Sequence, residues 1–388
     1  MHNFSLHAPT KVLFGQGQIA RIADEIPADA RVLVTYGGGS VERNGVLAAV
    51  RAALGARFAV EFGGIEPNPD HATLVQAVDL GRRERVDHVL AVGGGSVIDG
   101  SKFIAAALHY AGAPWEILTE AAAGRLALDS AVPLGVVLTL PATGSETNDG
   151  AVISRRATGD KLVFKSPHVF PRFAVLDPTV TYSLPPRQTA NGVVDAFVHV
   201  VEQYLTVPVD AKVQDRLAEG ILLTLVEDGP RVLVAPEDYA ARANVMWAAT
   251  MALNGFVGAG VPQDWATHMI GHELTAIHGL DHAQTLAVVL PAMLQLRRHH
   301  KRAKLLQYAD RVWGLRDGSE DARIDGAIAA TRGFFERMGV PTQVAGYGIR
   351  APRIAEILAK LQDHGMTALG EQGGVTLDVS QAVLEAAA

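Results

Sequence analysis

The chain of 388 residues contains no cysteine. Disulfide bonds, iron–sulfur clusters and thiolate zinc sites are therefore excluded, so any metal ion must be held by histidine and carboxylate side chains. No apolar stretch of about 18 residues is free of charges and turn residues, and we predict no membrane span. The first residues, Met1 to His7, lack the charged and then apolar layout of a signal peptide, so we expect a cytoplasmic protein.

Long runs of charge of either sign are also absent. The net charge is -7, and charged residues make up 19% of the chain against 48% hydrophobic residues. This balance is typical of a globular protein and argues against nucleic acid or an anionic membrane as the main partner. The length is sufficient for two domains of ordinary size.

The first half of the chain alternates short apolar segments with helical ones. The segments predicted as strands are 31–36, 56–62, 87–92, 134–140 and 173–178. This alternation predicts an α/β domain with a parallel sheet and helices on its faces. After Pro185 and Pro186 helical periodicity continues to the C-terminus. We therefore predict an N-terminal α/β domain over residues 1–185 and an all-helical domain over residues 186–388.

Two glycine-rich loops follow predicted strands and lead into predicted helices. They are Gly37-Gly38-Gly39-Ser40 and Gly93-Gly94-Gly95-Ser96. Such turns bring backbone amides close to a phosphate, and a helix N-terminus favours the negative charge. Neither loop has the common G-x-G-x-x-G fingerprint, and each could be only a tight turn. Two such loops in one parallel sheet nevertheless indicate a dinucleotide-binding domain.

The first loop also indicates which dinucleotide is bound. Many NAD sites place a carboxylate at this position to bind the adenosine ribose. Here only glycines and Ser40 follow Tyr36, and Arg43 lies close by in the sequence. Glycine amides and a serine hydroxyl can accept a 2′-phosphate, which a carboxylate would repel. We therefore predict NADP(H) as the cofactor.

A third polar turn, from Thr139 to Asn148, follows the strand 134–140. Open parallel sheets bind ligands at the carboxyl ends of their strands, so this turn is a further candidate for cofactor binding. As an alternative, the spacing of Thr143 and Glu146 fits a simple helix-capping box.

Asp195 and His199 lie four residues apart in a stretch that is otherwise almost wholly apolar. On a helix both side chains would share one buried face, where they need a partner, and a divalent cation is the strongest one. A buried ion pair or a hydrogen-bonded core histidine is the alternative. Further ligands are available at His268, His272, His278 and His282, and spacing does not choose among them. One carboxylate with three imidazoles would leave a divalent ion a net charge of about +1, sufficient to polarise a carbonyl.

These motifs jointly resemble the iron-containing (group III) alcohol dehydrogenases over essentially the whole chain, most closely the bacterial NADPH-dependent aldehyde reductase and butanol dehydrogenase branch. The matching segments are 9–17, 93–99, 139–146, 195–202 and 268–272. The resemblance implies that the metal ligands are Asp195, His199, His268 and His282, and that the ion is Fe2+ or Zn2+. It places His272 near the substrate as a proton relay and leaves His278 without a role. Many family members have His-Gly at the last ligand, whereas this chain has His282-Ala283.

The resemblance also implies cofactor contacts and an assembly. Together with the first loop, the implied cofactor-binding residues are Gly37, Gly38, Gly39, Ser40, Asn68, Gly94, Gly95, Ser96, Asp99, Thr139, Thr143, Asn148 and Lys161. Because family members are dimers or larger, we expect a homodimer.

The predicted function is reversible, metal-assisted hydride transfer between NADP(H) and small aldehydes or primary alcohols, with catalytic roles for His272, Asp195 and His199. The alternative is a dehydroquinate-synthase-like or glycerol-dehydrogenase-like enzyme of the same fold that uses NAD and a metal. A lyase of that kind needs several basic residues for its acidic substrate, whereas the segment around the predicted ligands is apolar. A third hypothesis, a non-catalytic metal- or nucleotide-binding protein, predicts binding without NADPH consumption.

Overall fold

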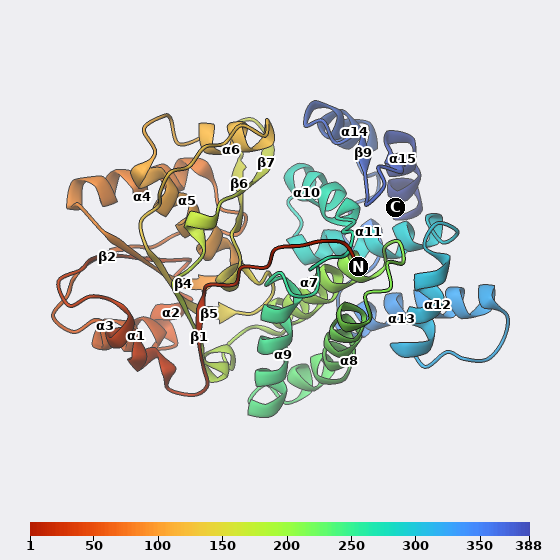
Figure 1. Ribbon diagram of the computed structural model, residues 1–388, viewed down its shortest axis with the longest axis horizontal. Coiled ribbons are helices and arrows are strands. Elements are labelled where there is room, and N and C mark those ends of the chain that lie inside the picture. The colour runs from red at the N-terminus through yellow and green to blue at the C-terminus, as the bar shows by residue number, and fades with distance from the viewer. The chain divides into compact units, whose positions relative to one another are not determined.

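The computed structural model describes all residues from Met1 to Ala388 and divides the chain into two compact units. An α/β unit contains residues 8–184 and 236–246, and a helical unit contains residues 1–7, 185–235 and 247–388 (Figure 1). The sequence placed residues 1–7 and 236–246 in the opposite units. The backbone N–H of His2 donates to the Gly260 carbonyl at 2.9 Å, and Met246 packs within an apolar core of the α/β unit. Such tertiary contacts leave no local sequence pattern.

A sheet of six parallel strands forms the centre of the α/β unit. The strands are β1 (Lys11–Phe14), β2 (Arg31–Tyr36), β3 (Phe58–Phe62), β4 (His88–Gly94), β5 (Leu134–Leu140) and β8 (Phe173–Leu176). Their order across the sheet is β1-β8-β5-β4-β2-β3. Parallel strands are buried on both faces and form continuous apolar runs, which made all but the short β1 recognisable in the sequence. The predicted α/β fold is confirmed.

Helices and short 3-10 turns cover both faces of this sheet. One face carries η1 (Gln18–Arg21), α1 (Ile22–Glu25), α2 (Ser40–Arg43) and α3 (Val46–Leu54), and the other carries α4 (His71–Glu84), α5 (Gly95–His109) and α6 (Glu116–Ala122). Within β2, Val32 and Val34 belong to the apolar core under η1 and α1–α3, whereas Leu33 belongs to the core under α4–α6. This alternation is what a strand requires, and it fixes which face each helix covers.

An antiparallel hairpin that the sequence did not predict extends the α/β unit. Its strands are β6 (Gly150–Arg155) and β7 (Asp160–Lys165). The 3-10 turns η2 (Ser145–Thr147) and η3 (Pro167–Val169) flank the hairpin in the sequence, and η4 (Pro178–Thr181) follows β8. The hairpin is separate from the six-stranded sheet. It carries Lys161, one of the predicted cofactor contacts.

The helical unit is built from long helices and one small hairpin. The helices are α7 (Pro186–Tyr204), α8 (Lys212–Val234), α9 (Tyr239–Ala252), α10 (Ala266–His278), α11 (His282–Leu296), α12 (Arg302–Arg311), α13 (Glu320–Arg337), α14 (Ile354–Asp363) and α15 (Leu377–Ala386), with the 3-10 turn η5 (Val344–Tyr347) and the two-residue strands β9 (Ala368–Leu369) and β10 (Val375–Thr376). The first part of α9 is counted with the α/β unit.

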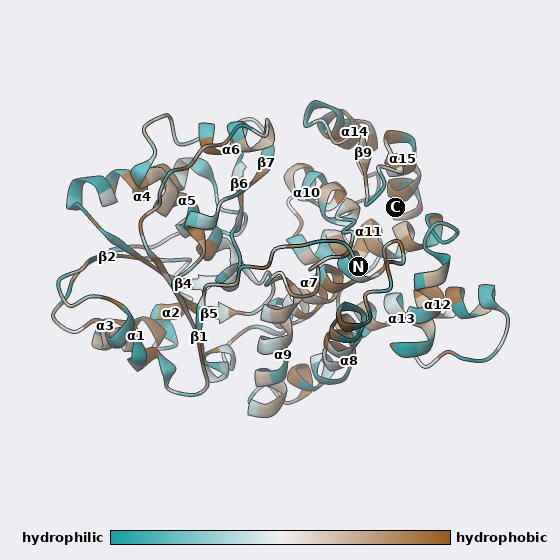
Figure 2. Ribbon diagram, viewed as in Figure 1, coloured by the Kyte–Doolittle hydropathy of each residue, from teal (hydrophilic) through white to brown (hydrophobic).

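Helix α7 is the centre of the helical unit. It packs against both α8 and α11, and α11 packs in turn against α10. Helix α11 is mainly hydrophobic along its length, as its brown colour shows (Figure 2). Because α7, α10 and α11 contact one another over buried faces, polar residues on those faces are brought together. None of the helices combines the length and the apolar character needed to cross a bilayer.

Candidate metal centre and cofactor-binding loops

Helix α7 places Asp195 and His199 on a buried face. Pro186 stands in the first turn, where no intrahelical N–H bond is required, and the valines around Asp195 and His199 are fully buried. Both polar side chains are only 4% exposed. The Asp195 Oδ1 and His199 Nε2 atoms lie 3.6 Å apart, which is longer than an ordinary hydrogen bond. These two atoms are therefore not joined by a direct hydrogen bond.

Two further imidazoles converge on the same carboxylate oxygen. From Asp195 Oδ1, the distance is 3.9 Å to His268 Nε2 of α10 and 3.7 Å to His282 Nε2 of α11. One ligand atom from each of the four residues lies within 4.8 Å of every other. Two ligands about 2.1 Å from one tetrahedral ion would lie roughly 3.4 Å apart. The observed spacing therefore suits four donor atoms around a common cation better than it suits direct pairing.

The environment of His268 also fits a cation. Its Nδ1 pairs with the buried Glu202 carboxylate, whereas its Nε2 is buried and has no hydrogen-bond partner. A buried nitrogen without a partner is costly unless something else occupies its lone pair. Imidazole nitrogens and a carboxylate oxygen are suitable ligands for zinc, iron and other divalent ions. The four side chains therefore form a credible binding site for one such ion.

The structure separates the two remaining candidate histidines of this region. His272 is 4% exposed, and its ring centroid lies 5.2 Å from that of His282 and 6.4 Å from that of His268. It is a direct neighbour of the cluster without being one of the four. His278 ends α10, and its Nε2 accepts a hydrogen bond from the Arg353 backbone N–H at 3.3 Å. Burial lowers the pKa of His278, which is consistent with this neutral acceptor role.

The first glycine loop leaves its backbone accessible at the end of β2. The Gly37 carbonyl accepts from the N–H groups of Gly39 and Gly64 at 2.9 and 3.0 Å, which closes the turn. Gly38 and Ser40 are exposed, and no atom lies within 4 Å of a Cβ placed on Gly38. Such a Cβ on Gly39 would lie 3.6 Å from Arg43 Nη1. The loop thus combines the exposed backbone of Gly38, the Ser40 hydroxyl and a nearby cation.

A carboxylate also lies close to this first loop. A Cβ on Gly39 would be 3.3 Å from Glu42 Oε2, and Glu42 Oε1 accepts from the Tyr36 hydroxyl at 3.3 Å. The proximity of Glu42 raises the pKa of Tyr36, after burial as the larger cause. Glu42 and Arg43 are both exposed beside the loop, and Glu42 accepts the hydrogen bond from Tyr36.

The second glycine loop is packed so tightly that no side chain fits in it. It joins β4 to α5, and a Cβ on Gly95 would lie 2.5 Å from Thr143 Cγ2 and from Thr143 Oγ1. On Gly94 a Cβ would lie 2.9 Å from the Cβ of Leu140. Glycine is thus required for the third polar turn to approach the start of α5. The fifteen-residue α5 directs its N-terminus toward this approach, which favours a phosphate.

The structure brings Asn68, Ser96 and Lys161 together, although they are far apart in the sequence. The backbone N–H of Asn68 donates to Ser96 Oγ at 3.2 Å, and Lys161 Nζ donates to Asn68 Oδ1 at 2.9 Å. Asn68 has a φ of 53°, a left-handed conformation that asparagine tolerates better than most residues. All three were predicted as cofactor contacts, and they now form one hydrogen-bonded group beside the second loop.

Asp99 and Asn148 are held by hydrogen bonds within the same unit. Asp99 Oδ1 accepts from Ser145 Oγ at 2.5 Å, and Oδ2 accepts from the Val152 backbone at 2.9 Å. Asn148 Oδ1 accepts from Lys102 Nζ at 2.9 Å, and Lys102 also donates to the Gly150 carbonyl at 2.8 Å. Burial lowers the pKa of Lys102 to about 8. Lys102 was not predicted to have such a role from the sequence, where only its position one turn after Asp99 could have suggested one.

The third polar turn does not form the helix-capping box that was the alternative interpretation of Thr143 and Glu146. Thr143 Oγ1 accepts from the Ser145 backbone N–H at 3.2 Å, and the short 3-10 turn η2 follows. This is a local turn rather than the start of a capped α-helix. Thr139 is buried at the end of β5, 9% exposed. The turn therefore stays a candidate for ligand binding at the carboxyl end of a strand.

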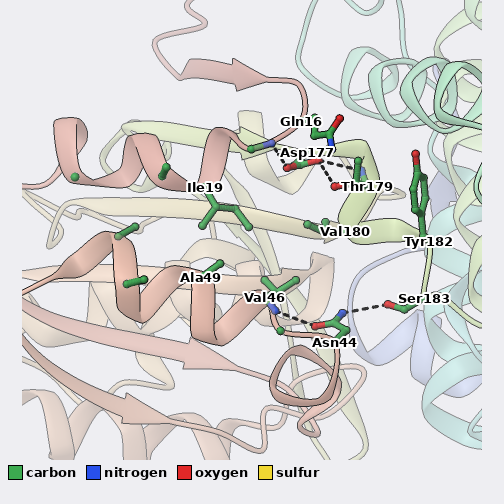
Figure 3. A pocket seen from close by; sticks show the side chains of 16 residues that line it. Gln16, Ile19, Asn44, Val46, Ala49, Asp177, Thr179, Val180, Tyr182 and Ser183 are labelled. Atoms are coloured by element: carbon green, nitrogen blue, oxygen red, sulfur yellow. Dashed lines mark hydrogen bonds between the residues drawn. The ribbon is translucent and has the colours of Figure 1, made fainter.

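A separate pocket of about 880 Å³ in the α/β unit contains none of the predicted site residues (Figure 3). The Asp177 carboxylate accepts from the backbone N–H groups of Gly17 and Thr179 at 2.6 and 3.0 Å. Asn44 donates to Ser183 Oγ at 3.1 Å. These hydrogen bonds of Asn44, Asp177 and Ser183 join segments of the fold, and we assign no chemistry to the pocket.

Comparison with known proteins gives the chain a family context. Residues 9–178 match the family of iron-containing alcohol dehydrogenases, and residues 189–376 match the C-terminal domain of the Fe-containing alcohol dehydrogenase family. The chain is 64% identical over 389 aligned positions to the NADPH-dependent aldehyde reductase YqhD of Escherichia coli (strain K12), with 100% of each protein covered.

Two solved structures are similar along their whole length. The crystal structure of E. coli YqhD superposes with a TM-score of 0.98 at 64% identity, covering 100% of this chain and 99% of the other. The NADH-dependent butanol dehydrogenase A from Thermotoga maritima superposes with a TM-score of 0.95 at 34% identity, with the same coverage. The E. coli protein is named as NADPH-dependent and the T. maritima protein as NADH-dependent. Family membership alone therefore does not identify the cofactor of this chain.

Proposed function

Because this chain belongs to the iron-containing alcohol dehydrogenase family, we propose that it is a metal-dependent oxidoreductase that transfers a hydride between NADP(H) and small aldehydes or primary alcohols. The observation that carries the proposal is the convergence of three imidazole Nε2 atoms on Asp195 Oδ1, at 3.6 to 3.9 Å. These donors include no thiolate, and a catalytic role requires that the ion accept one further ligand beside the four protein atoms.

Asp195, His199, His268 and His282 would hold the ion, which we expect to be Fe2+ or Zn2+. When bound, a divalent cation supplies a Lewis acid that polarises a carbonyl oxygen. His272 lies beside the ring of His282 and is buried, so it can hold a proton at an imidazole nitrogen and release it to the product oxygen. Reduction of an aldehyde requires one hydride and one proton, and His272 would supply the proton.

The α/β unit supplies the cofactor-binding residues in this proposal. Backbone amides of the second loop and the N-terminus of α5 suit a pyrophosphate, and the Asn68, Ser96 and Lys161 group lies beside them. The residues assigned to the cofactor remain Gly37, Gly38, Gly39, Ser40, Asn68, Gly94, Gly95, Ser96, Asp99, Thr139, Thr143, Asn148 and Lys161. We favour NADP(H) because the exposed Ser40 and Arg43 suit a 2′-phosphate. The E. coli relative is also NADPH-dependent by name.

Small, weakly polar aldehydes are the substrates that the surroundings of the four ligands favour. The Trp265 ring lies edge-on to His268 at 5.2 Å and to His199 at 6.1 Å. Helices α10 and α11 contain no lysine or arginine, and the single arginine of α7, Arg187, lies 3.6 Å from Asp281. An enzyme of the dehydroquinate-synthase-like kind would need basic side chains here for its acidic substrate.

The proposal is tested by following NADPH and NADH oxidation with butanal in the purified protein. Activity should be higher with NADPH, should be lost on treatment with a chelator, and should return with Fe(II), Zn(II) or Mn(II) added singly. Binding of metal and cofactor without any oxidation of NADPH would contradict an enzymatic role. The cytoplasmic homodimer expected from the sequence belongs to the same proposal, and light scattering of the purified protein tests its dimeric state.

A further inference from the structure

Glu202 is a buried carboxylate to which the proposed chemistry gives no role. It lies on α7, three residues after His199, and is 3% exposed. Its Oε2 pairs with His268 Nδ1, and its Oε1 accepts from the Thr267 backbone N–H at 2.7 Å. Both oxygens are therefore used by consecutive residues in the first turn of α10. Burying a carboxylate in this position costs desolvation free energy, and a function of Glu202 would explain why it is there.

We propose that Glu202 is a positioning residue that orients His268 and fixes its tautomer for metal binding. This inference rests on the proposed function, because it requires the four clustered side chains to hold a metal ion. A neutral imidazole has one N–H, and a carboxylate can only accept a hydrogen bond. Glu202 therefore keeps the proton on Nδ1 and leaves the lone pair on Nε2, the atom 3.9 Å from Asp195 Oδ1.

The backbone around Glu202 holds the first turn of α10 in the same position. The Asp264 N–H donates to the Glu202 carbonyl at 2.9 Å, and Asp264 Oδ1 accepts from the Ala266 N–H at 2.9 Å. With Thr267 also bound, the segment 264–268 is attached to α7 by backbone and side-chain contacts together. As a result, the rings of His199 and His268 stack with centroids 4.6 Å apart. Glu202 thus sets both the orientation of the His268 ring and the nitrogen that carries its proton.

The chain contains a matched pair that shares the chemistry but not the position. Glu273 lies on α10, as His268 does, and is fully buried, and its Oε1 lies 2.8 Å from Nδ1 of His364. His364 is not among the four clustered residues. If buried glutamate–histidine pairs served only to stabilise the helical unit, altering Glu202 or Glu273 should have similar consequences. If Glu202 acts through His268, only its alteration should change metal binding.

Glutamine is the informative replacement for Glu202. It offers one accepting oxygen and one donating amide, so it cannot accept from both Thr267 N–H and His268 Nδ1–H. When its oxygen faces Thr267, its NH2 group faces Nδ1 and favours the tautomer with the proton on Nε2, which cannot bind a metal. We expect Glu202→Gln to weaken zinc affinity about 10- to 100-fold, the usual effect of losing such a partner. Glu202→Asp keeps two accepting oxygens and should retain affinity closer to that of the parent.

The experiment measures zinc dissociation constants of the parent, Glu202→Gln, Glu202→Asp and Glu273→Gln by competition with a chromophoric chelator. The melting temperatures of the metal-free proteins and the absorption spectra of the cobalt(II) forms are recorded beside them. The proposal requires weaker zinc binding in Glu202→Gln with parental affinity in Glu273→Gln. Equal losses in the two glutamine variants, or parental affinity in Glu202→Gln, would overturn it.

A second measurement does not depend on any variant folding. In the metal-free parent protein, nitrogen-15 correlation spectra of the histidine side chains report which ring nitrogen of His268 carries the proton. Nδ1–H supports the proposal, and Nε2–H contradicts it. Neither this readout nor zinc affinity requires turnover, so absence of aldehyde reduction would refute the proposed function while leaving the role of Glu202 open to its own test.

Discussion

Replacing Gly95 with alanine tests whether the second glycine loop binds the cofactor. A Cβ at this position would lie 2.5 Å from both Cγ2 and Oγ1 of Thr143, closer than real Cβ atoms approach their neighbours. Thr143 cannot rotate away freely, because its Oγ1 accepts from the Ser145 N–H at 3.2 Å. Ser145 is in turn bound to Asp99. The new methyl group must therefore push the third polar turn away from α5.

The expected magnitude follows from the cost of inserting a methyl group into a packed contact. Overpacking of this kind costs about 1 to 3 kcal/mol. If the cost falls on the conformation that binds NADPH, each ~1.4 kcal/mol weakens binding tenfold, and the dissociation constant rises about 5- to 150-fold. If the loop instead relaxes in the free protein, the melting temperature falls and binding changes less. The two measurements together locate the strain.

The assay is calorimetric titration with NADPH, combined with thermal unfolding of the free protein. Gly220→Ala is the matched control, because Gly220 is exposed on α8 and no atom lies within 4 Å of its Cβ position. Alanine there should leave NADPH affinity unchanged and stabilise the helix by up to about 1 kcal/mol. A folded Gly95→Ala protein with parental stability and NADPH affinity would refute the reasoning about this loop.

Three further variants test the metal centre and the buried charges. Asp195→Ala removes the oxygen on which three imidazoles converge, so zinc binding and NADPH oxidation should both be abolished, and an active, metal-replete variant would contradict the assignment. Lys102→Met removes the donor to Asn148 Oδ1 and to the Gly150 carbonyl, and because Asn148 is one of the residues assigned to the cofactor, the KM for NADPH should rise. Because burial lowers the pKa of Lys102 to about 8, the folded parent binds fewer protons than the unfolded chain between about pH 8 and 10.5, so its stability should rise with pH there, and the variant should lack this slope. Lys301→Met removes the cation that lies 2.5 Å from Asp264 and 3.1 Å from Glu371, and should destabilise the protein by about 3 to 5 kcal/mol in urea unfolding at neutral pH. Burial already raises the pKa of Glu371, and losing Lys301 should raise this pKa further. Above about pH 4 the folded variant therefore binds more protons than its unfolded chain, so its stability falls as the pH rises and the destabilisation should be smaller at pH 5 than at pH 8.

The sequence identified features that local pattern determines. Buried parallel strands are recognisable as apolar runs, and a polar pair one turn apart on an apolar helix is recognisable as Asp195 and His199. The β6–β7 hairpin was not predicted because the apolar runs of its strands are only three residues long and polar residues flank them. The group formed by Asn68, Ser96 and Lys161 joins three separate elements, so no spacing in the sequence could have indicated it.

Spacing in the sequence also could not decide between His278 and His282, and the structure provides the physical reason. His278 lies ten residues after His268 on the same helix, which is about 15 Å along its axis. Gly279 then adopts a φ of 71°, a left-handed conformation that ends α10 and lets α11 begin at His282. The reversal of the chain brings His282 back beside His268, with ring centroids 5.2 Å apart. The end of α10 therefore keeps His278 away from His268, and the start of α11 brings His282 next to it.

The charge of the candidate centre differs from the sequence-based value once Glu202 is included. Three neutral imidazoles and Asp195 would leave a divalent ion with a net charge of about +1. The Glu202 carboxylate, paired with His268, adds a second negative charge, so the buried cluster with its ion becomes about neutral. Neutrality lowers the cost of burying the ion and removes the attraction for an anionic substrate. With no lysine or arginine on α10 or α11 to restore that attraction, the centre is suited to an uncharged carbonyl compound, which is the reason to expect aldehydes rather than acidic substrates.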